Sequence, residues 1–492
     1  MSPNTHFSPE NPLDSPVVEL IIHDPSIVYE VGDEVVVIAM RADLVVSREA
    51  REASPDLDQA LAAVAVPRGS IVELGGRFGK GQEDDGPDLA QAPDAAPVPG
   101  PASDVELWRL IDPERNSLDE VRRLRPLARD VVITTPDGLE LSLPAVSPNH
   151  VSIVSPHIAG CPAGPPQPSA RPHDDGPFVR PLEGPARARV AVIDTGYIVT
   201  DPPHRALDER VTSVLGSALD TATDPPQWVP DPPDEITTNP DGRLHEIVGH
   251  GTFIAGLIAH LCDEAALTVV GQRDQDILIT GETAPEQKRL FSSEVALAHA
   301  LLEHADTDVV QLGFSFPTLD DYPSLPFARV MQLLSGPDAP RPGVAVVTPA
   351  GNEDSAHPFW PAALPGVIGV AATSRRGRSK AKFSNWGPWL DCCARGEDVV
   401  STYIHWAGPV EGDPIDEVEI FDGWARWDGT SFAAPKVSAA IARLVAAEEG
   451  LLPVDAFQRL VLGESDVRVT QVTDYTLSGP PGVTLPQLHI WR

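Results

Sequence analysis

The chain has 492 residues and a hydrophobic fraction of 42%, and no apolar run approaches the ~18 residues that a membrane-spanning helix requires. This composition predicts a soluble protein without a membrane partner. The 72 acidic residues outnumber the 36 basic ones, and the resulting net charge of −36 would repel the phosphates of nucleic acid and argues against such a partner.

The amino-terminal segment and the cysteines predict a cytoplasmic location. Residues 1–16 are polar and proline-rich and lack the basic and apolar regions of a secretory signal, so we expect a disordered tail there. Two of the four cysteines are adjacent, a spacing that fits neither a zinc knuckle nor a disulfide framework. The 53 prolines and the preference for arginine over lysine are typical of a GC-rich bacterial coding sequence.

The length predicts two or three domains, and residues 17–80 predict a first small α/β unit of unknown role. Strand-like runs occur in it at 17–22, 34–39 and 71–74. A helical pattern occurs at 57–65. Residues 81–104 are rich in Asp, Pro, Ala and Gly. Because they cannot bury enough apolar surface to order themselves, they predict a linker.

Residues 105–158 predict a second small α/β unit. It contains strand-like runs at 105–110, 131–135 and 139–143 and a helical pattern at 117–125. A further linker is predicted at 159–187. Neither unit carries a motif that we can connect with chemistry.

From residue 188 the pattern changes to buried apolar runs that alternate with helical ones. Strands are predicted at 190–193, 266–270, 309–312, 344–348 and 367–371, and helices at 253–261, 293–304 and 327–334. This alternation predicts a mostly parallel sheet covered by helices on both faces. Such a sheet binds its ligands beyond the carboxyl ends of its strands.

Asp194 stands at the end of the predicted strand at 190–193 and is followed by Thr195 and Gly196. An aspartic protease also presents its carboxylate in an Asp-Thr-Gly motif after an apolar strand. That class requires two carboxylates that share one proton, from a second motif or from a homodimer. The chain has no second Asp-Thr-Gly, which disfavours the aspartic class.

His250 lies in the motif Gly249–Thr252, at the start of a predicted helix whose apolar residues fall on one face. His245 lies five residues earlier, whereas the zinc-protease pattern places its histidines four apart. A separation of five residues turns the two side chains about 140° away from each other. The spacing therefore disfavours a zinc site.

Ser431 lies in the motif Gly429–Pro435, which we expect to open a long helix ending at Gly450. A serine here stands at the positive end of the helix, and its small neighbours leave access for a substrate carbonyl. The second glycine of the Gly-x-Ser-x-Gly motif is missing. This disfavours a lipase or esterase of the α/β-hydrolase type.

Taken in the order Asp194, His250, Ser431, the three motifs resemble the catalytic triad of the subtilisin family. The order differs from that in chymotrypsin-like enzymes and α/β-hydrolases. The resemblance implies a subtilisin-like three-layer α/β domain with a mostly parallel sheet at 188–475, followed by a carboxy-terminal tail at 476–492. It also implies a serine endopeptidase that hydrolyses protein or peptide substrates through an acyl-enzyme intermediate.

The same resemblance implies the role of each residue. His250, oriented by Asp194, would accept the proton of Ser431 and return it to the leaving amine. Catalysis would require no metal and no organic cofactor. Structural calcium is common in the family, but no ligands for it can be assigned from this sequence.

Asn352 follows the predicted strand at 344–348, in a stretch that resembles the family's strand leading to its oxyanion asparagine. The resemblance implies that the side-chain amide stabilises the tetrahedral oxyanion. The alternative is an asparagine that only caps a turn. We expect its neighbours Ala350, Gly351 and Glu353 to contact the substrate.

The sequence departs from the family in two places. Where the family presents a Ser-Leu-Gly strand to the substrate, this chain has Gln-Leu-Gly-Phe-Ser at 311–315. We expect Gly313, Phe314 and Ser315 to bind substrate in a cleft of altered shape. The acidic, proline-rich stretch at 224–241 predicts either a surface insertion or a lid over that cleft.

Two alternatives stay open at this point. The unit at 105–158 resembles the small α/β propeptide of many family members and would then be removable, or it is a permanent accessory domain. The whole chain could instead be a binding or scaffolding protein whose protease domain is occluded or inactive. The sequence indicates neither the natural substrate nor the oligomeric state.

Overall fold

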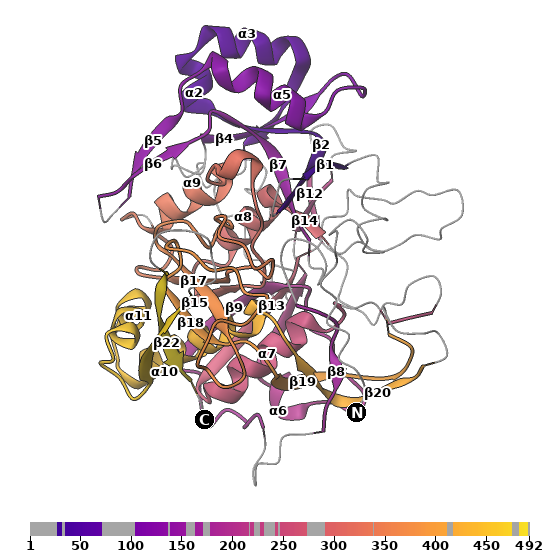
Figure 1. Ribbon diagram of the computed structural model, residues 1–492, viewed down its shortest axis with the longest axis vertical. Coiled ribbons are helices and arrows are strands. Elements are labelled where there is room, and N and C mark those ends of the chain that lie inside the picture. The colour runs from indigo at the N-terminus through magenta and orange to yellow at the C-terminus, as the bar shows by residue number, and fades with distance from the viewer. Residues whose placement is uncertain are drawn as a thin grey trace, which may run out of the picture.

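Figure 1 shows the computed structural model of the chain. It describes residues 27–31, 35–70, 104–135, 138–153, 163–170, 178–215, 217–220, 227–230, 242–244, 247–272, 291–337, 339–410, 417–474 and 482–490. Several predictions lie outside these ranges, namely the tail at 1–16, the runs at 17–22 and 71–74, linker residues 81–103 and most of the stretch at 224–241.

A nine-stranded sheet forms the centre of the larger part of the molecule (Figure 1). Every neighbouring pair of strands in it is parallel except the antiparallel pair β21–β22 at one edge. In sheet order the strands are β10 (Val211–Leu215), β13 (Ala265–Gly271), β9 (Ala188–Asp194), β15 (Val309–Leu312), β16 (Ala345–Pro349), β17 (Val367–Thr373), β18 (Cys392–Arg395), β22 (Thr484–His489) and β21 (Arg468–Thr473). The five strands predicted for this domain are all present.

Helices cover both faces of this sheet. They are α7 (His250–Leu261), α8 (Glu294–Glu303), α9 (Leu325–Leu334) and α10 (Ala434–Ala447), with α11 (Pro453–Val461) packed beside α10. Alternate residues of a strand face opposite sides. In β9, Val190 and Val192 share a hydrophobic cluster with α7 and α10, whereas Ala191 and Ile193 share another with α8 and α9. The result is an α/β domain, as the sequence predicts.

Of the carboxy-terminal tail predicted at 476–492, the structure describes residues 482–490, and these belong to the domain. Their strand β22 lies inside the sheet, between β18 and β21, and Leu485 and Leu488 are buried. The sequence signal for β22 is weak because Pro486 lies within the strand and cannot donate to a ladder. The domain therefore extends past the predicted boundary at 475.

A second sheet contains the amino-terminal strands in the order β14-β7-β2-β4-β3, with β1 paired to β2. The strands are β1 (Ile27–Val31), β2 (Val36–Ser47), β3 (Ala65–Ser70), β4 (Val105–Leu110), β7 (Val146–Ile153) and β14 (Phe291–Ser293). Helices α2 (Arg48–Ala53), α3 (Pro55–Val64) and α5 (Ser117–Leu124) accompany it, and β5 (Val131–Thr134) pairs with β6 (Glu140–Leu143).

The division into separate units at 17–80 and 105–158 does not describe this sheet. β2 pairs with β4 on one side and with β7 on the other, and β3 pairs with β4. The intervening linker thus connects two neighbouring strands of one sheet. The composition of the linker predicts a domain boundary, but the strands on both sides of it bury their apolar residues in one common core.

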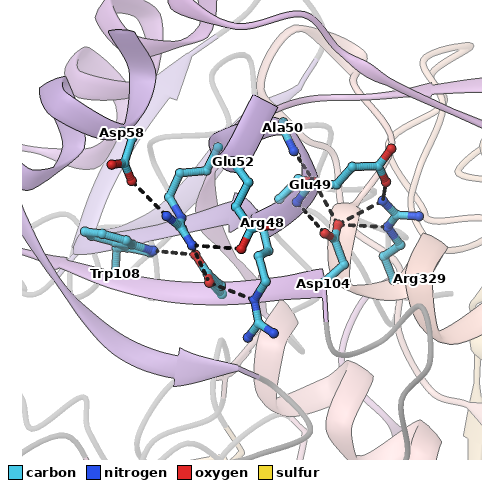
Figure 2. A network of polar contacts seen from close by, with 11 residues as sticks. Arg48, Glu49, Ala50, Glu52, Asp58, Asp104, Trp108 and Arg329 are labelled. Atoms are coloured by element: carbon cyan, nitrogen blue, oxygen red, sulfur yellow. Dashed lines mark hydrogen bonds and ion pairs between the residues drawn. The ribbon is translucent and has the colours of Figure 1, made fainter. Parts of the chain in front are cut away.

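The amino-terminal sheet is joined to the larger domain by a strand pair and by buried polar contacts. β14, which directly precedes α8, pairs with β7. Arg329 of α9 donates to Asp104 Oδ2 at 2.8 Å and to Glu49 Oε2 at 3.1 Å (Figure 2). His150 Nδ1 lies 2.9 Å from Glu294 Oε1. No helix within the described residues is both long and apolar enough to span a membrane.

Candidate active site

Asp194 and His250 form a buried pair at the carboxyl edge of the larger sheet. Asp194 is the last residue of β9, and His250 is the first residue of α7. The imidazole Nδ1 lies 2.8 Å from Asp194 Oδ1 and 3.0 Å from Oδ2. Thr195 N donates to the same Oδ1 at 2.7 Å. These contacts fix the ring so that its other nitrogen, Nε2, points away from the carboxylate.

Glycines allow neighbouring chain segments to approach this pair. A Cβ at Gly313 would lie 1.7 Å from Asp194 Oδ2, and a Cβ at Gly251 would lie 2.2 Å from Gly196 O. Gly249, just before the histidine, has a φ of 77°, a region in which other residues are strained. A side chain at any of these positions would displace the motif.

Aromatic rings enclose the imidazole of His250. The indole of Trp427 lies edge-on to it, with ring centroids 5.6 Å apart and planes at 86°, and Phe432 lies 5.4 Å away. His250 is fully buried, and its Nε2 has no hydrogen-bond partner among the described residues. An unpaired buried nitrogen of this kind is uncommon and marks a candidate base.

Ser431 is the middle residue of a short 3-10 turn, η5 (Thr430–Phe432). The long helix α10 begins only at Ala434, so the serine precedes the helix rather than opening it. Its Oγ is buried and has no hydrogen-bond partner among the described residues. Because the next residue, Phe432, packs against the imidazole, the serine and His250 lie in the same buried region.

Asn352 follows β16 and is held against the serine turn. Its Oδ1 accepts hydrogen bonds from Thr430 N at 2.9 Å and from Thr430 Oγ1 at 3.0 Å. Gly351 N donates to the same hydroxyl at 3.2 Å. The side chain is therefore oriented by the residue that precedes Ser431, with its oxygen turned toward that residue.

The residues at 311–315 lie mostly inside the protein. The ring centroids of Phe314 and of Phe327 on α9 lie 6.2 Å apart. The main-chain carbonyl of Phe314 accepts a hydrogen bond from Thr348 Oγ1 at 2.6 Å. Ser315 is buried and its Oγ has no partner among the described residues. Gln311 Oε1 accepts from Ser438 Oγ of α10 at 2.6 Å. The unusual residues of this segment thus point their side chains into the core.

The candidates next to Asn352 are organised by Asn385, which the sequence analysis does not single out. Asn385 Nδ2 donates to Ala350 O at 3.0 Å and to Glu353 Oε2 at 2.8 Å, while its Oδ1 accepts from Glu353 N at 3.0 Å. Ala350 and Gly351 are buried, and Glu353 is partly exposed. The segment 383–387 resembles a family segment that we interpret as scaffold, but the partners of Asn385 lie 32 and 35 residues away in the chain.

Trp427 and Thr430 are two further residues that the sequence analysis does not identify. Trp427 borders the imidazole, and Thr430 orients Asn352. Within the described ranges, no three His, Cys, Asp or Glu side chains are grouped so that they could hold a metal ion.

Comparison with known proteins gives one family. Residues 186–478 match the model of the Subtilase family. A thermophilic serine proteinase of Bacillus sp. (strain AK1) is 26% identical over 270 residues, which cover 54% of this chain and 54% of that protein. The major intracellular serine protease of Bacillus subtilis (strain 168) is 28% identical over 242 residues, which cover 47% of this chain and 65% of that protein.

Among solved structures, fervidolysin from Fervidobacterium pennivorans, a keratinolytic enzyme related to subtilisin, has a TM-score of 0.48 at 16% identity. The match covers 88% of this chain and 58% of that one. The chain thus spans 54% of the length of the thermophilic serine proteinase and 65% of that of the intracellular serine protease.

Proposed function

The chain belongs to the subtilase family, and on that premise we propose that it is a serine endopeptidase with Asp194, His250 and Ser431 as its catalytic triad. The observation that supports this most is the unpaired, buried Nε2 of His250, whose opposite nitrogen is bound to Asp194. The equally unpaired Oγ of Ser431 lies in the same buried region.

The proposed reaction begins with acyl transfer to the serine. Ser431 Oγ attacks the carbonyl carbon of the peptide bond while His250 Nε2 accepts the hydroxyl proton. Asp194 holds the imidazole in the tautomer that leaves Nε2 able to accept, and it stabilises the imidazolium that forms. The carbon–nitrogen bond then breaks, and the imidazolium gives its proton to the leaving amine.

The second half of the reaction releases the acyl group. A water molecule replaces the amine, and its oxygen bonds to the acyl carbon while His250 accepts one of its protons. The ester bond to Ser431 then breaks, the proton returns to Oγ, and the carboxylic acid leaves.

Asn352 is proposed to stabilise the oxyanion that forms in both halves. Because its Oδ1 accepts from Thr430, its orientation beside Ser431 is set before the substrate binds. A preorganised amide donor aimed at developing charge costs no reorganisation during the reaction. The main-chain N–H of Ser431 would be the second donor.

The chain's own segment at 163–168 is proposed to restrict access to this site. Ala163 N donates to Asp428 O at 2.9 Å, and β8 (Gln167–Pro168) pairs with β20 (Glu419–Trp427), which lies beside β19 (Val399–Gly408). Trp427 Nε1 also donates to Gly164 O at 2.6 Å. Because Trp427 also borders the buried imidazole of His250, the segment at 163–168 is attached to one wall of the site.

The alternative of an inactive protease-fold scaffold is not favoured. Asp194, His250, Ser431 and Asn352 all keep the residue types that the proposed chemistry needs. The amino-terminal domain is then either a removable propeptide or a permanent accessory domain of an active enzyme.

The proposal is tested by comparing peptide hydrolysis by the wild-type protein and by Ser431→Ala. The variant should lose turnover and keep the wild-type circular dichroism spectrum, because one buried hydroxyl contributes little packing. A folded Ser431→Ala protein with wild-type turnover would contradict the triad assignment.

A further inference from the structure

Lys436 is buried in the first turn of α10, five residues after Ser431. It is only 8% exposed, and its Nζ donates to the carbonyl of Arg395, at the end of β18, at 2.8 Å. No carboxylate within the described residues forms an ion pair with it. A cation is also unfavourable at the positive end of a helix. Burial of an amine at such a site lowers the stability of the fold. We therefore look for a role of Lys436 in the function of the site.

The carbonyl that Lys436 binds belongs to a turn that also contacts the chain before the serine. Gly429 N donates to Gly396 O at 2.9 Å, and Asp398 N donates to Asp428 Oδ1 at 2.5 Å. A Cβ at Gly396 would lie 2.6 Å from Gly429 O, so the close approach requires glycine. The turn at 395–398 thus contacts both sides of the segment that carries Ser431.

This turn is itself firmly held. Gly396 N donates to Thr373 O of β17 at 3.2 Å. The Asp398 carboxylate accepts from Arg375 at 2.8 Å and from Arg426 at 3.1 Å. The turn therefore connects the serine segment to the central sheet, and Lys436 connects the first turn of α10 to the same point.

The charged groups around Lys436 favour its neutral form. Burial, with a further contribution from the positive charge of Arg395, lowers the pKa of Lys436 to about 7. Burial lowers the pKa of Arg395, and the negative charges of the acidic side chains at 397, 398 and 428 oppose this shift. In either protonation state the amine has an N–H to donate, so its hydrogen bond to Arg395 O can persist across neutral pH.

We propose that Lys436 is a positioning residue, which acts through the turn at 395–398 to hold Ser431 in register with His250. The inference rests on the proposed function, since it assigns a role within that site. Without the amine, the serine turn can shift against the imidazole, and even a small misplacement of a nucleophile slows the chemical step.

The experiment compares Lys436→Met with Arg443→Met. Both changes replace a basic residue of α10 by methionine, but Arg443 pairs with Asp466 at the surface. Lys436→Met should lower kcat by about tenfold or more, as misplaced catalytic groups do, with KM unchanged. Its thermal midpoint should stay equal or rise, because a buried amine is removed. Arg443→Met should retain wild-type kcat.

A purely structural lysine would give a different result. Its loss would lower the thermal midpoint without lowering kcat in the folded fraction, and that outcome overturns the inference. Asp428→Ala removes a second side-chain contact between the turn and the serine segment, and it should lower kcat with KM unchanged. If Lys436→Met does not fold, a wild-type kcat in Asp428→Ala overturns the inference.

The rate of labelling by a fluorophosphonate separates this inference from the proposed function. A wild-type protein that is neither labelled nor hydrolytic contradicts the proposed function, and the inference with it. A wild-type protein and a Lys436→Met variant labelled at equal rates contradict the positioning role alone. Slower labelling of Lys436→Met than of Arg443→Met supports it.

Discussion

Gly313 lies so close to Asp194 that a Cβ at this position would come within 1.7 Å of the carboxylate Oδ2. The glycine follows β15, the neighbour of the strand that ends in Asp194, so the two residues meet at the edge of the sheet. The Asp194 carboxylate therefore occupies space that is open because the residue after β15 is a glycine.

We expect Gly313→Ala to displace the carboxylate and to leave His250 without its partner. Loss of this orientation costs on the order of 10⁴-fold in kcat in a comparable triad. Steady-state kinetics and thermal unfolding should be measured together. A folded Gly313→Ala protein with wild-type kcat would show that the carboxylate keeps its contact with His250 beside an added methyl group.

Asn352→Ala should keep KM near the wild-type value and lose about 10²- to 10³-fold in kcat, a magnitude measured for this donor in the family. The reason is that the amide serves the oxyanion and not the ground-state carbonyl. If Asn352 only caps a turn, the variant will lose thermal stability and turn over substrate normally.

Much of the candidate site can be located from the sequence because its residues lie in short motifs near strand ends and helix starts. Asp194 ends β9 and His250 begins α7, as their flanking sequences indicate. The roles of Trp427 and Asn385 could not be predicted, because each depends on contacts between segments far apart in the chain. Local patterns contain no information about such pairs.

The same limit applies to the domain division. The linker composition at 81–104 suggested a boundary, but strand pairing is not local, and β3 and β4 on its two sides are neighbours in one sheet. At 311–315 the residue types suggested an altered cleft, whereas Phe314 and Gln311 contact α9 and α10. Gln311 lies in β15 and Phe314 follows it, so the direction of these side chains depends on how the strand and the segment after it are placed in the fold.

Substrates with Lys or Arg just before the scissile bond should be cleaved better at low than at high ionic strength. Glu353 follows Asn352 and is partly exposed, and the chain as a whole is strongly acidic. Glu353→Gln should reduce this preference by about fivefold or less, since a partly exposed ion pair contributes about 1 kcal/mol at most. A preference for large apolar residues that ignores salt would indicate an apolar pocket instead.

If the amino-terminal domain is a propeptide, the wild-type protein should cut itself between residues 160 and 187. The segment at 163–168 already lies along β20, next to the strand end that leads to Ser431. Intact-mass analysis should find the fragments in the wild type and only full-length chain in Ser431→Ala. Full-length chains in both samples, under conditions in which the enzyme cleaves added peptide, would identify a permanent accessory domain.

The central claim, that Asp194 and His250 activate Ser431, is tested most directly by the mass of the protein after reaction with a fluorophosphonate. Our account predicts one adduct per wild-type chain at Ser431, almost none on His250→Ala, and none on Ser431→Ala. An adduct on Ser431→Ala, or equally fast labelling of wild type and His250→Ala, would contradict it.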